Sequence, residues 1–269
     1  MDRREFIASA LAGSAFAAVA TGAGAQAAQE AGDANKREFY LLRRYLLSAG
    51  PQRVLTDAYF RDALVPALNR LEFSPIGVFN ETIGAEMPVM YVLIPSFSVE
   101  KLVTVDERLK QDDAYVKAAA PFLNAPEKEP AFKRMESSLM QAFEKMPRLM
   151  LPPASVARSP RVFELRTYEG ASELDHQRKI EQMSSGEVDI FNKAGISQVF
   201  YGDTLVGDRM PNLTYMVMFG SLAERDQKWS AFFSSDEWKT LSNNPRFNFE
   251  SIVSNTSNPM LAPTPYSQI

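Results

Sequence analysis

Two short segments with the same alternating pattern stand 123 residues apart in the chain. Val162–Tyr168 reads VFELRTY and Phe39–Tyr45 reads FYLLRRY, so a leucine, an arginine and a tyrosine recur at matching places. Side chains that alternate between two faces are typical of a β-strand. Agreement continues elsewhere in the same register, for example at Ser74 and Ser197. The repeat therefore predicts two copies of one structural unit.

The first copy has a pattern that predicts the order β-α-β-β-α-β. The expected elements are a strand at Glu38–Leu46, a helix at Gln52–Leu71 interrupted by Pro66, strands at Ser74–Asn80 and Pro88–Pro95, a helix capped by Ser98, and helical turns at Asp112–Ala120. We predict a last strand at Lys133–Phe143, although the composition there favours a helix, because the second copy has the alternating FNFESIVS at Phe247–Ser254.

The second copy repeats this order. The expected elements are a strand at Arg161–Tyr168, a helix at Glu173–Ala194 interrupted near Gly186, strands at Ile196–Gly202 and Asn212–Phe219, and a helix at Ser221–Phe233. One extra residue in the second hairpin would change the offset between the copies, so that Tyr91 of the first copy is equivalent to Tyr215 of the second. The predicted fold class is α+β, with two tandem ferredoxin-like units at 37–147 and 160–269 whose antiparallel sheets carry helices on one face.

Composition limits the classes of partner. Of the 269 residues, 45% are hydrophobic and 23% are charged, which is typical of a globular protein. The formal charge of −4 argues against a nucleic-acid partner, which would favour a basic surface. Because the chain has no cysteine, disulfides and thiolate ligands or nucleophiles are excluded.

The N-terminal segment predicts where the protein is located rather than how it folds. Arg3 and Arg4 precede a mildly apolar stretch and a small-residue cleavage pattern, which resembles a twin-arginine export signal over residues 1–27. The apolar part is too short for permanent membrane insertion. We therefore expect a bacterial protein that is periplasmic or otherwise exported. The alternative is an alanine-rich helix of the domain.

The alternating strand in the second copy offers the first candidate site. If Phe163 and Leu165 lie under the helices, then Glu164, Arg166 and Tyr168 face away from them, toward a second sheet. Two such sheets would enclose a barrel lumen suited to a small molecule, to which Arg43 and Tyr45 of the first copy would contribute. The alternative is an ion pair with purely structural value. The sequence leaves open whether the barrel closes within one chain or in a homodimer or higher oligomer.

His176 is the only histidine, and it stands at the start of a predicted helix. It could serve as a general base, with Glu164 as the other catalytic candidate, but an exposed histidine in a first turn is the more common situation. One histidine and no cysteine predict no transition-metal site, and no motif indicates a cofactor. Arg209, in a turn, could reach an anionic ligand or form an ordinary charged turn.

Several motifs together resemble the NIPSNAP family, in its exported bacterial branch. They are VFELRTYEG at 162–170, His176 with Arg178 and Lys179, VFYG at 199–202, PNLTYM at 211–216, the spaced Trp229 and Trp238, and PYSQI at 265–269. The resemblance covers the second copy end to end. It implies a dimeric α/β-barrel fold, whose wider superfamily includes cofactor-free monooxygenases, small isomerases and haem-binding enzymes. The family has no agreed catalytic residues, so it assigns none here.

Four functions remain from these observations. The first is a binding protein that holds a small anionic or aromatic molecule in the barrel lumen. The second is a cofactor-independent oxygenase or isomerase that uses His176 or Glu164 for proton transfer. A haem enzyme with His176 as the iron ligand and a purely structural role are the third and fourth.

Overall fold

In the computed structural model, nine β-strands of the described part of the chain, residues 36–269, form one antiparallel sheet. The strands are β1 (Phe39–Leu46), β2 (Gly77–Ile83), β3 (Val89–Ser96), β4 (Arg134–Ala142), β5 (Val162–Gly170), β6 (Ser197–Val206), β7 (Asn212–Phe219), β8 (Val253–Ser257) and β9 (Met260–Pro263). Their order is β7-β6-β4-β1-β3-β2-β9-β5-β8, and β7 also pairs with β5, so the sheet closes into a barrel. The predicted export signal, including Arg3 and Arg4, lies outside the described residues.

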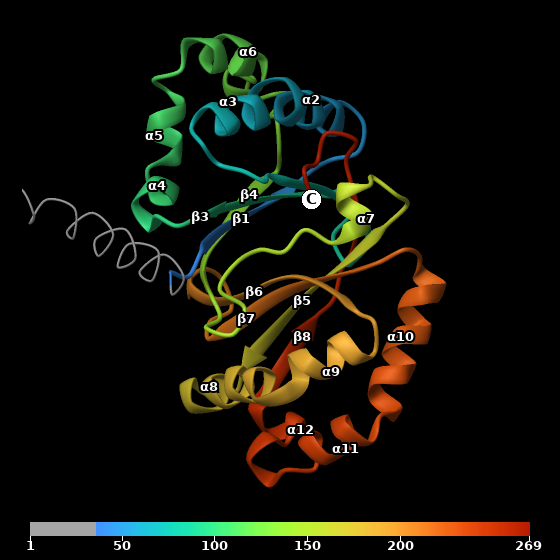
Figure 1. Ribbon diagram of the computed structural model, residues 1–269. Helices are drawn as coiled ribbons and strands as arrows, with labels where there is room; N and C mark the ends of the chain where they lie inside the picture. Colours follow the sequence, from blue (N-terminus) through green and yellow to red (C-terminus); the bar gives the residue numbers. More distant parts are fainter. Residues whose placement is uncertain (1–35) are drawn as a thin grey trace, which may run out of the picture. The chain divides into compact units, whose positions relative to one another are not determined.

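Helices cover the barrel in two groups, one for each half of the chain (Figure 1). The first group contains α2 (Pro51–Tyr59), the π-helical turn η1 (Phe60–Leu64), α3 (Val65–Arg70), α4 (Val99–Val103), α5 (Val105–Leu109) and α6 (Asp113–Leu123). The short α7 (Pro153–Val156) lies between the halves. The second group contains α8 (Glu173–Gln182), η2 (Met183–Glu187), α9 (Val188–Lys193), α10 (Leu222–Ser234), α11 (Asp236–Ser242), the 3₁₀ turn η3 (Pro245–Phe247) and α12 (Phe249–Ile252). None of the helices described is long and apolar enough to cross a membrane.

The two halves have the ferredoxin-like strand order that the sequence repeat predicts. Within the barrel, β4-β1-β3-β2 is the order of the first half and β8-β5-β7-β6 that of the second. The repeat extends to local detail: the π-helical turns η1 and η2 are 123 residues apart, and serines at positions 98 and 221 cap α4 and α10 through bonds from a backbone N–H three residues on. The predicted strand at Lys133–Phe143 is confirmed as β4.

The barrel closes within one chain. Strand β4 of the first half pairs with β6 of the second, and β2 pairs with β9. Strands β8 and β9 together replace the single final strand of the first half, because β8 pairs with the end of β5 and β9 with its beginning. No second chain is needed to form the lumen.

Two details of the sequence prediction are wrong. The segment Phe247–Ser254 is not a strand: it is mostly helical, and the strand begins only at Val253. The extra residue in the second hairpin does not align Tyr91 with Tyr215 either. Tyr91 pairs across the sheet with Arg44, whereas Tyr215 pairs with Arg166, so the two tyrosines lie on opposite faces of their strands.

Three apolar clusters show which strand faces look inward. One contains only residues of the first half, from its helices and strands, and another is built almost entirely from those of the second half. The third draws on strands of both halves but on no covering helix, so it must fill the barrel interior; it includes Tyr40, Leu42, Phe163, Leu165 and Phe200. Strands β1, β3, β5 and β7 therefore bury side chains on both faces.

Candidate functional site

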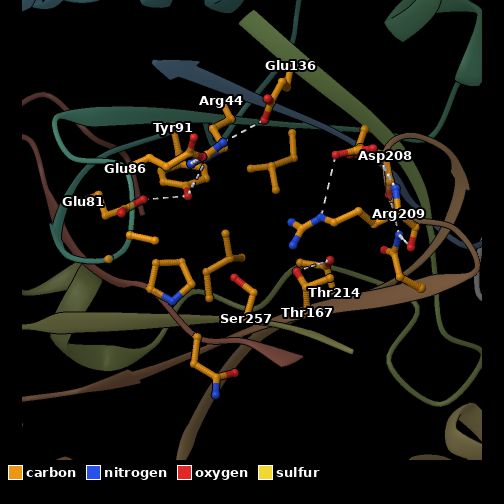
Figure 2. Close-up of a pocket in the computed structure, with 18 of the residues that line it drawn as sticks. Arg44, Glu81, Glu86, Tyr91, Glu136, Thr167, Asp208, Arg209, Thr214 and Ser257 are labelled. Carbon is orange, nitrogen blue, oxygen red and sulfur yellow. Dashed lines mark hydrogen bonds and ion pairs between the residues drawn. The ribbon is translucent and has the colours of Figure 1, made fainter. Parts of the chain in front are cut away.

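A cavity of about 610 Å³ occupies the end of the barrel at which β1 and β5 finish. It lies above the apolar interior cluster and beside the β2–β3 and β6–β7 hairpins, and most of its lining side chains are polar or charged (Figure 2). We call this cavity the polar cup. Its volume is within the range of small-molecule sites in proteins.

The first half of the chain supplies a charged wall of the polar cup. Arg44 on β1 donates from Nε to the Tyr91 hydroxyl at 3.2 Å, from one terminal nitrogen to Glu136 at 2.8 Å and from the other to Glu86 at 2.7 Å. The Tyr91 hydroxyl in turn donates to Glu81 Oε2 at 2.9 Å. These side chains converge on the cavity (Figure 2). The bonds hold the wall in one arrangement.

The second half supplies Asp208 and Arg209 from its hairpin and, beside them, an uncharged wall. The hydroxyls of Thr167 on β5 and Thr214 on β7 are 2.8 Å apart, and Thr204 donates to Asn212 Oδ1 at 2.7 Å. Ser257 extends this wall (Figure 2). Each hydroxyl can donate one hydrogen bond and accept two, so these groups keep capacity for a ligand.

Burial and neighbouring charge determine the protonation of the charged wall. Burial, followed by the adjacent Glu81 carboxylate, raises the pKa of Tyr91, so the phenol stays protonated and donates. The hydrogen bond and charge of Arg44 lower the pKa of Glu86. Burial alone would lower the pKa of Arg44, but its bonds to Glu86 and Glu136 raise it overall. Arg44 and Glu86 are therefore charged at neutral pH, and Tyr91 is a neutral donor.

Gly84, in the β2–β3 hairpin, allows the chain to close over Glu81. A Cβ at this glycine would lie 1.7 Å from Glu81 Oε1, so any other residue would displace the carboxylate. The equivalent glycine of the second half, Gly207, would meet Ser138 instead, at 2.8 Å. A small residue in each hairpin thus permits side chains to fill the space beneath it.

The prediction that Glu164, Arg166 and Tyr168 line the lumen is wrong. The structure reverses the faces: Leu165 and Thr167 line the polar cup, and the predicted residues lie under the helices. The reason is a helix distant in sequence, because Trp229 of α10, 65 residues after Glu164, donates to Glu164 Oε2 at 2.8 Å. Alternation alone could not show which face the helices would cover.

The Glu164 carboxylate is fully buried and completely engaged. Arg225 donates to both of its oxygens, at 2.8 and 2.9 Å, and Arg166 forms a further ion pair with it. Arg166 also bonds to the Tyr168 hydroxyl at 2.8 Å and lies 4.6 Å from the Trp229 ring. Burial would raise the pKa of Glu164, but Arg225 and Arg166 outweigh this and lower it. These contacts suit a structural network rather than a proton carrier.

Arg43 and Tyr45, the equivalent candidates of the first half, also lie on the helix side. Arg43 forms a two-pronged pair with Asp106 of α5, at 2.8 and 2.9 Å. Tyr45 packs edge-on against Phe60, with ring centroids 5.0 Å apart. The prediction that these two residues reach the lumen is therefore wrong as well.

His176 is not an exposed first-turn histidine, so that expectation is wrong. Its ring is 4% exposed, its Nε2 lies 2.8 Å from Asp203 Oδ1, and its Nδ1 is buried with no bonding partner. It packs beneath Gly170, where an added Cβ would meet the His176 Cβ at 2.7 Å. The histidine belongs to the helix side of β6, away from the polar cup.

These contacts also test the fit of a haem or a metal ion. A haem iron could reach His176 Nε2 only by displacing Asp203, so the histidine does not fit an iron ligand as it stands. Within residues 36–269 no group of three or more histidine, aspartate or glutamate side chains is arranged to hold a metal ion.

The residues of the polar cup were missed by the sequence analysis, apart from Arg209. That turn arginine lines the cup and pairs with Glu169 at 3.2 Å. A signal for Arg44 was present, because it follows Arg43 directly and must point to the opposite face of the same strand. Glu81 had no such signal, because the predicted strand ends at Asn80, whereas β2 continues to Ile83.

Fold and cavity together define a class: a single-chain α/β barrel made of two ferredoxin-like repeats with a polar cup at one end of its lumen. Residues 163–268 match the sequence model of the NIPSNAP family. This part of the chain is thus similar in sequence to NIPSNAP domains. No curated protein sequence matches the chain.

Solved structures support this class. A provisionally assigned monooxygenase from Lactobacillus acidophilus has a TM-score of 0.55 and 9% identity, and the match covers 84% of this chain and 94% of that one. A similarly assigned protein from Fusobacterium nucleatum has a TM-score of 0.54 and 7% identity, covering 84% and 92%. At such identities the similarity concerns the fold. A NIPSNAP-like domain protein from Burkholderia xenovorans, with a TM-score of 0.36 and 15% identity, covers 40% of this chain and 89% of its own.

Proposed function

We propose that this protein binds a small molecule in the polar cup. The observation that carries the proposal is a cavity of about 610 Å³ with a charged wall on one side and a hydroxyl-lined wall on the other. Arg44 is held by three partners, so the charged wall is ordered before a ligand arrives. Such preorganisation reduces the entropy lost on binding.

Native mass spectrometry of protein purified from a host that exports it tests this proposal. We expect an additional mass that disappears on denaturation. In the variant Ser257→Trp the indole fills the cup, so the additional mass should be lost. The matched control is Ser234→Trp, at the exposed end of α10, which should retain it. Retention in both variants would contradict binding in the cup.

A cofactor-independent oxygenase or isomerase is the second candidate. Its support is the Tyr91–Glu81 pair, in which a phenol donates to a carboxylate beside the cavity, as a proton-transfer site requires. The bound molecule should then be turned over, and in Tyr91→Phe the loss of turnover should exceed the loss of affinity. If Tyr91→Phe turns the molecule over as fast as wild type, a mechanism in which Tyr91 transfers a proton is wrong.

We also propose that residues 1–27 direct export through the twin-arginine route. The support is Arg3-Arg4 followed by a mildly apolar segment. In a bacterial host, wild-type protein should accumulate outside the cytoplasm in processed form, whereas a variant with Arg3→Lys and Arg4→Lys should stay inside unprocessed. Equal processing of both would refute the proposal.

A further inference from the structure

One carboxylate of the polar cup has no cationic partner. Glu81 is 6% exposed, and its Oε2 accepts a hydrogen bond from the neutral Tyr91 phenol at 2.9 Å. Over residues 36–269 no lysine or arginine forms an ion pair with it. Withdrawing a carboxylate from water is costly unless opposite charge or several hydrogen bonds replace the water. Glu81 is thus a site at which a cation would be stabilised.

The neighbouring carboxylates differ from Glu81 because arginines satisfy them. Glu86 pairs with Arg44 at 2.7 Å, and Glu136 pairs with Arg44 and Arg134, both at 2.8 Å. Counted together, three arginines and four carboxylates line the cup, so the formal charge of the lining is −1. The surplus charge belongs to Glu81.

Of the anionic or aromatic ligands that the sequence suggested, this balance disfavours the anionic ones. An anion would meet arginines that already have carboxylate partners, and it would lie near an unpaired carboxylate of the same sign. The opposite wall carries neutral hydroxyls, including those of Thr167 and Ser257, which pair with hydroxyl groups rather than with charges.

We infer that the polar cup accepts a hydroxylated primary amine, with the ammonium group on Glu81 and the ligand hydroxyls on the threonine and serine wall. The inference rests on the proposed binding function and adds the chemical class of the ligand. An ammonium supplies three donors to an acceptor-rich site, and its charge cancels that of the lining.

Three sugars of the same ring size and different charge form a matched test: glucosamine, glucose and glucuronate. Isothermal titration calorimetry at slightly acidic pH keeps the amine protonated. We expect glucosamine to bind roughly tenfold more tightly than glucose, and glucuronate to bind most weakly. In Glu81→Gln, which keeps an acceptor for Tyr91, the preference for glucosamine over glucose should fall to about twofold or less. The control Glu127→Gln, in an exposed loop, should behave as wild type.

A second variant protects the test against a folding defect. Gly84→Ala pushes on the flexible end of Glu81 rather than on backbone, so the protein should fold while its preference for glucosamine falls. The equivalent change in the other hairpin, Gly207→Ala, pushes on the Ser138 hydroxyl of the lining and not on Glu81. It should therefore change the affinity for glucosamine and glucose alike and leave the preference unchanged.

Two outcomes overturn the inference: glucuronate that binds as tightly as glucosamine, or a preference that is unchanged in Glu81→Gln. If none of the three sugars binds, the amine class is wrong. The proposed function then stands if native mass spectrometry finds an occupant that Ser257→Trp expels. It falls with the inference if no occupant is found.

Discussion

The two halves of the barrel share topology, register and π-helical turns, yet they place their charges on opposite faces of the sheet. In the first half the charges of Arg44 and Glu81 face the lumen, and the helix side holds one well-formed pair, Arg43 with Asp106. In the second half Glu164 and Arg166 face the helices. A repeated fold therefore does not imply a repeated site, and each face must be assigned from its own contacts.

The same contrast separates stability from binding. The second half, which contains the residues that match the NIPSNAP model, buries Glu164 under four donated hydrogen bonds. It also encloses a Lys179–Glu187 pair with a 2.7 Å contact. Most of the charged residues of the polar cup come instead from the first half, outside the matched residues 163–268, whereas Asp208 and Arg209 come from the second half. Substitutions in the two networks should consequently affect different properties of the protein.

The largest effect is expected for Glu164→Ala. Removing this carboxylate leaves Arg166 buried without its ion-pair partner, which should lower the free energy of unfolding by about 3–5 kcal/mol. Urea denaturation measures the change. The double variant Glu164→Leu with Arg166→Met removes both charges and should recover part of the loss. A loss below about 1 kcal/mol for Glu164→Ala would show that the network contributes no more than a surface pair.

The depressed pKa of Glu164 also predicts the direction of a pH effect. Because the pKa is lower in the folded protein, the stabilisation is complete above the ordinary glutamate value of about 4.3. It is lost as the pH falls through the lower folded value. The stability difference between wild type and Glu164→Gln should therefore shrink in this acid range. A difference that grows with acidification would contradict the assignment.

Tyr91→Phe should have the next largest effect, and it should act in the cup. The variant removes the hydroxyl between Arg44 and Glu81, so a buried carboxylate loses its donor and stability should fall by about 1.5–3 kcal/mol. Ligand affinity should fall as well, as titration of the copurified molecule would measure. Glu164→Ala, if folded, should bind normally. Equal binding losses in both variants would remove the distinction between the two halves.

Asp106→Asn tests the single helix-side pair of the first half. Arg43 is 7% exposed but the Asp106 side chain is 60% exposed, and asparagine keeps one acceptor for Arg43, so the free energy of unfolding should fall by only about 1–1.5 kcal/mol. Urea denaturation beside Glu164→Ala provides the comparison. If the free energy of unfolding falls as much as in Glu164→Ala, the stability of both halves depends equally on ion pairs between strands and helices.

The smallest change in stability is expected for Gly84→Ala, with an effect on binding that is larger in proportion. The atoms nearest to the added methyl group belong to the Glu81 side chain. The free energy of unfolding should therefore fall by about 1 kcal/mol or less, while ligand affinity falls. Thermal denaturation and titration of the same sample separate the two quantities. Unchanged affinity would show that the position of Glu81 does not matter for the ligand.

Much of the fold could be predicted because the repeat carries information that local propensity lacks. The β4 segment, with its helix-favouring composition, was assigned correctly as a strand only because the second half required one. The same argument failed in detail at Phe247–Ser254, where the final strand is divided between β8 and β9 and begins later. Composition could not show a division that depends on pairing with β5 and β2.

Alternation along the strands was sufficient to group Glu164 with Arg166 and Tyr168, and to separate Arg43 from Arg44. It was not sufficient to show which group faces the lumen. Alternation assigns side chains to two faces of a strand but does not show which face the helices cover. On most sheets the apolar face identifies the core, but here β1 and β5 are buried on both sides. The choice depended on contacts distant in sequence, such as Trp229 with Glu164. Closure of the barrel, which brings β4 to β6 and β2 to β9, then created the polar cup from residues of both halves.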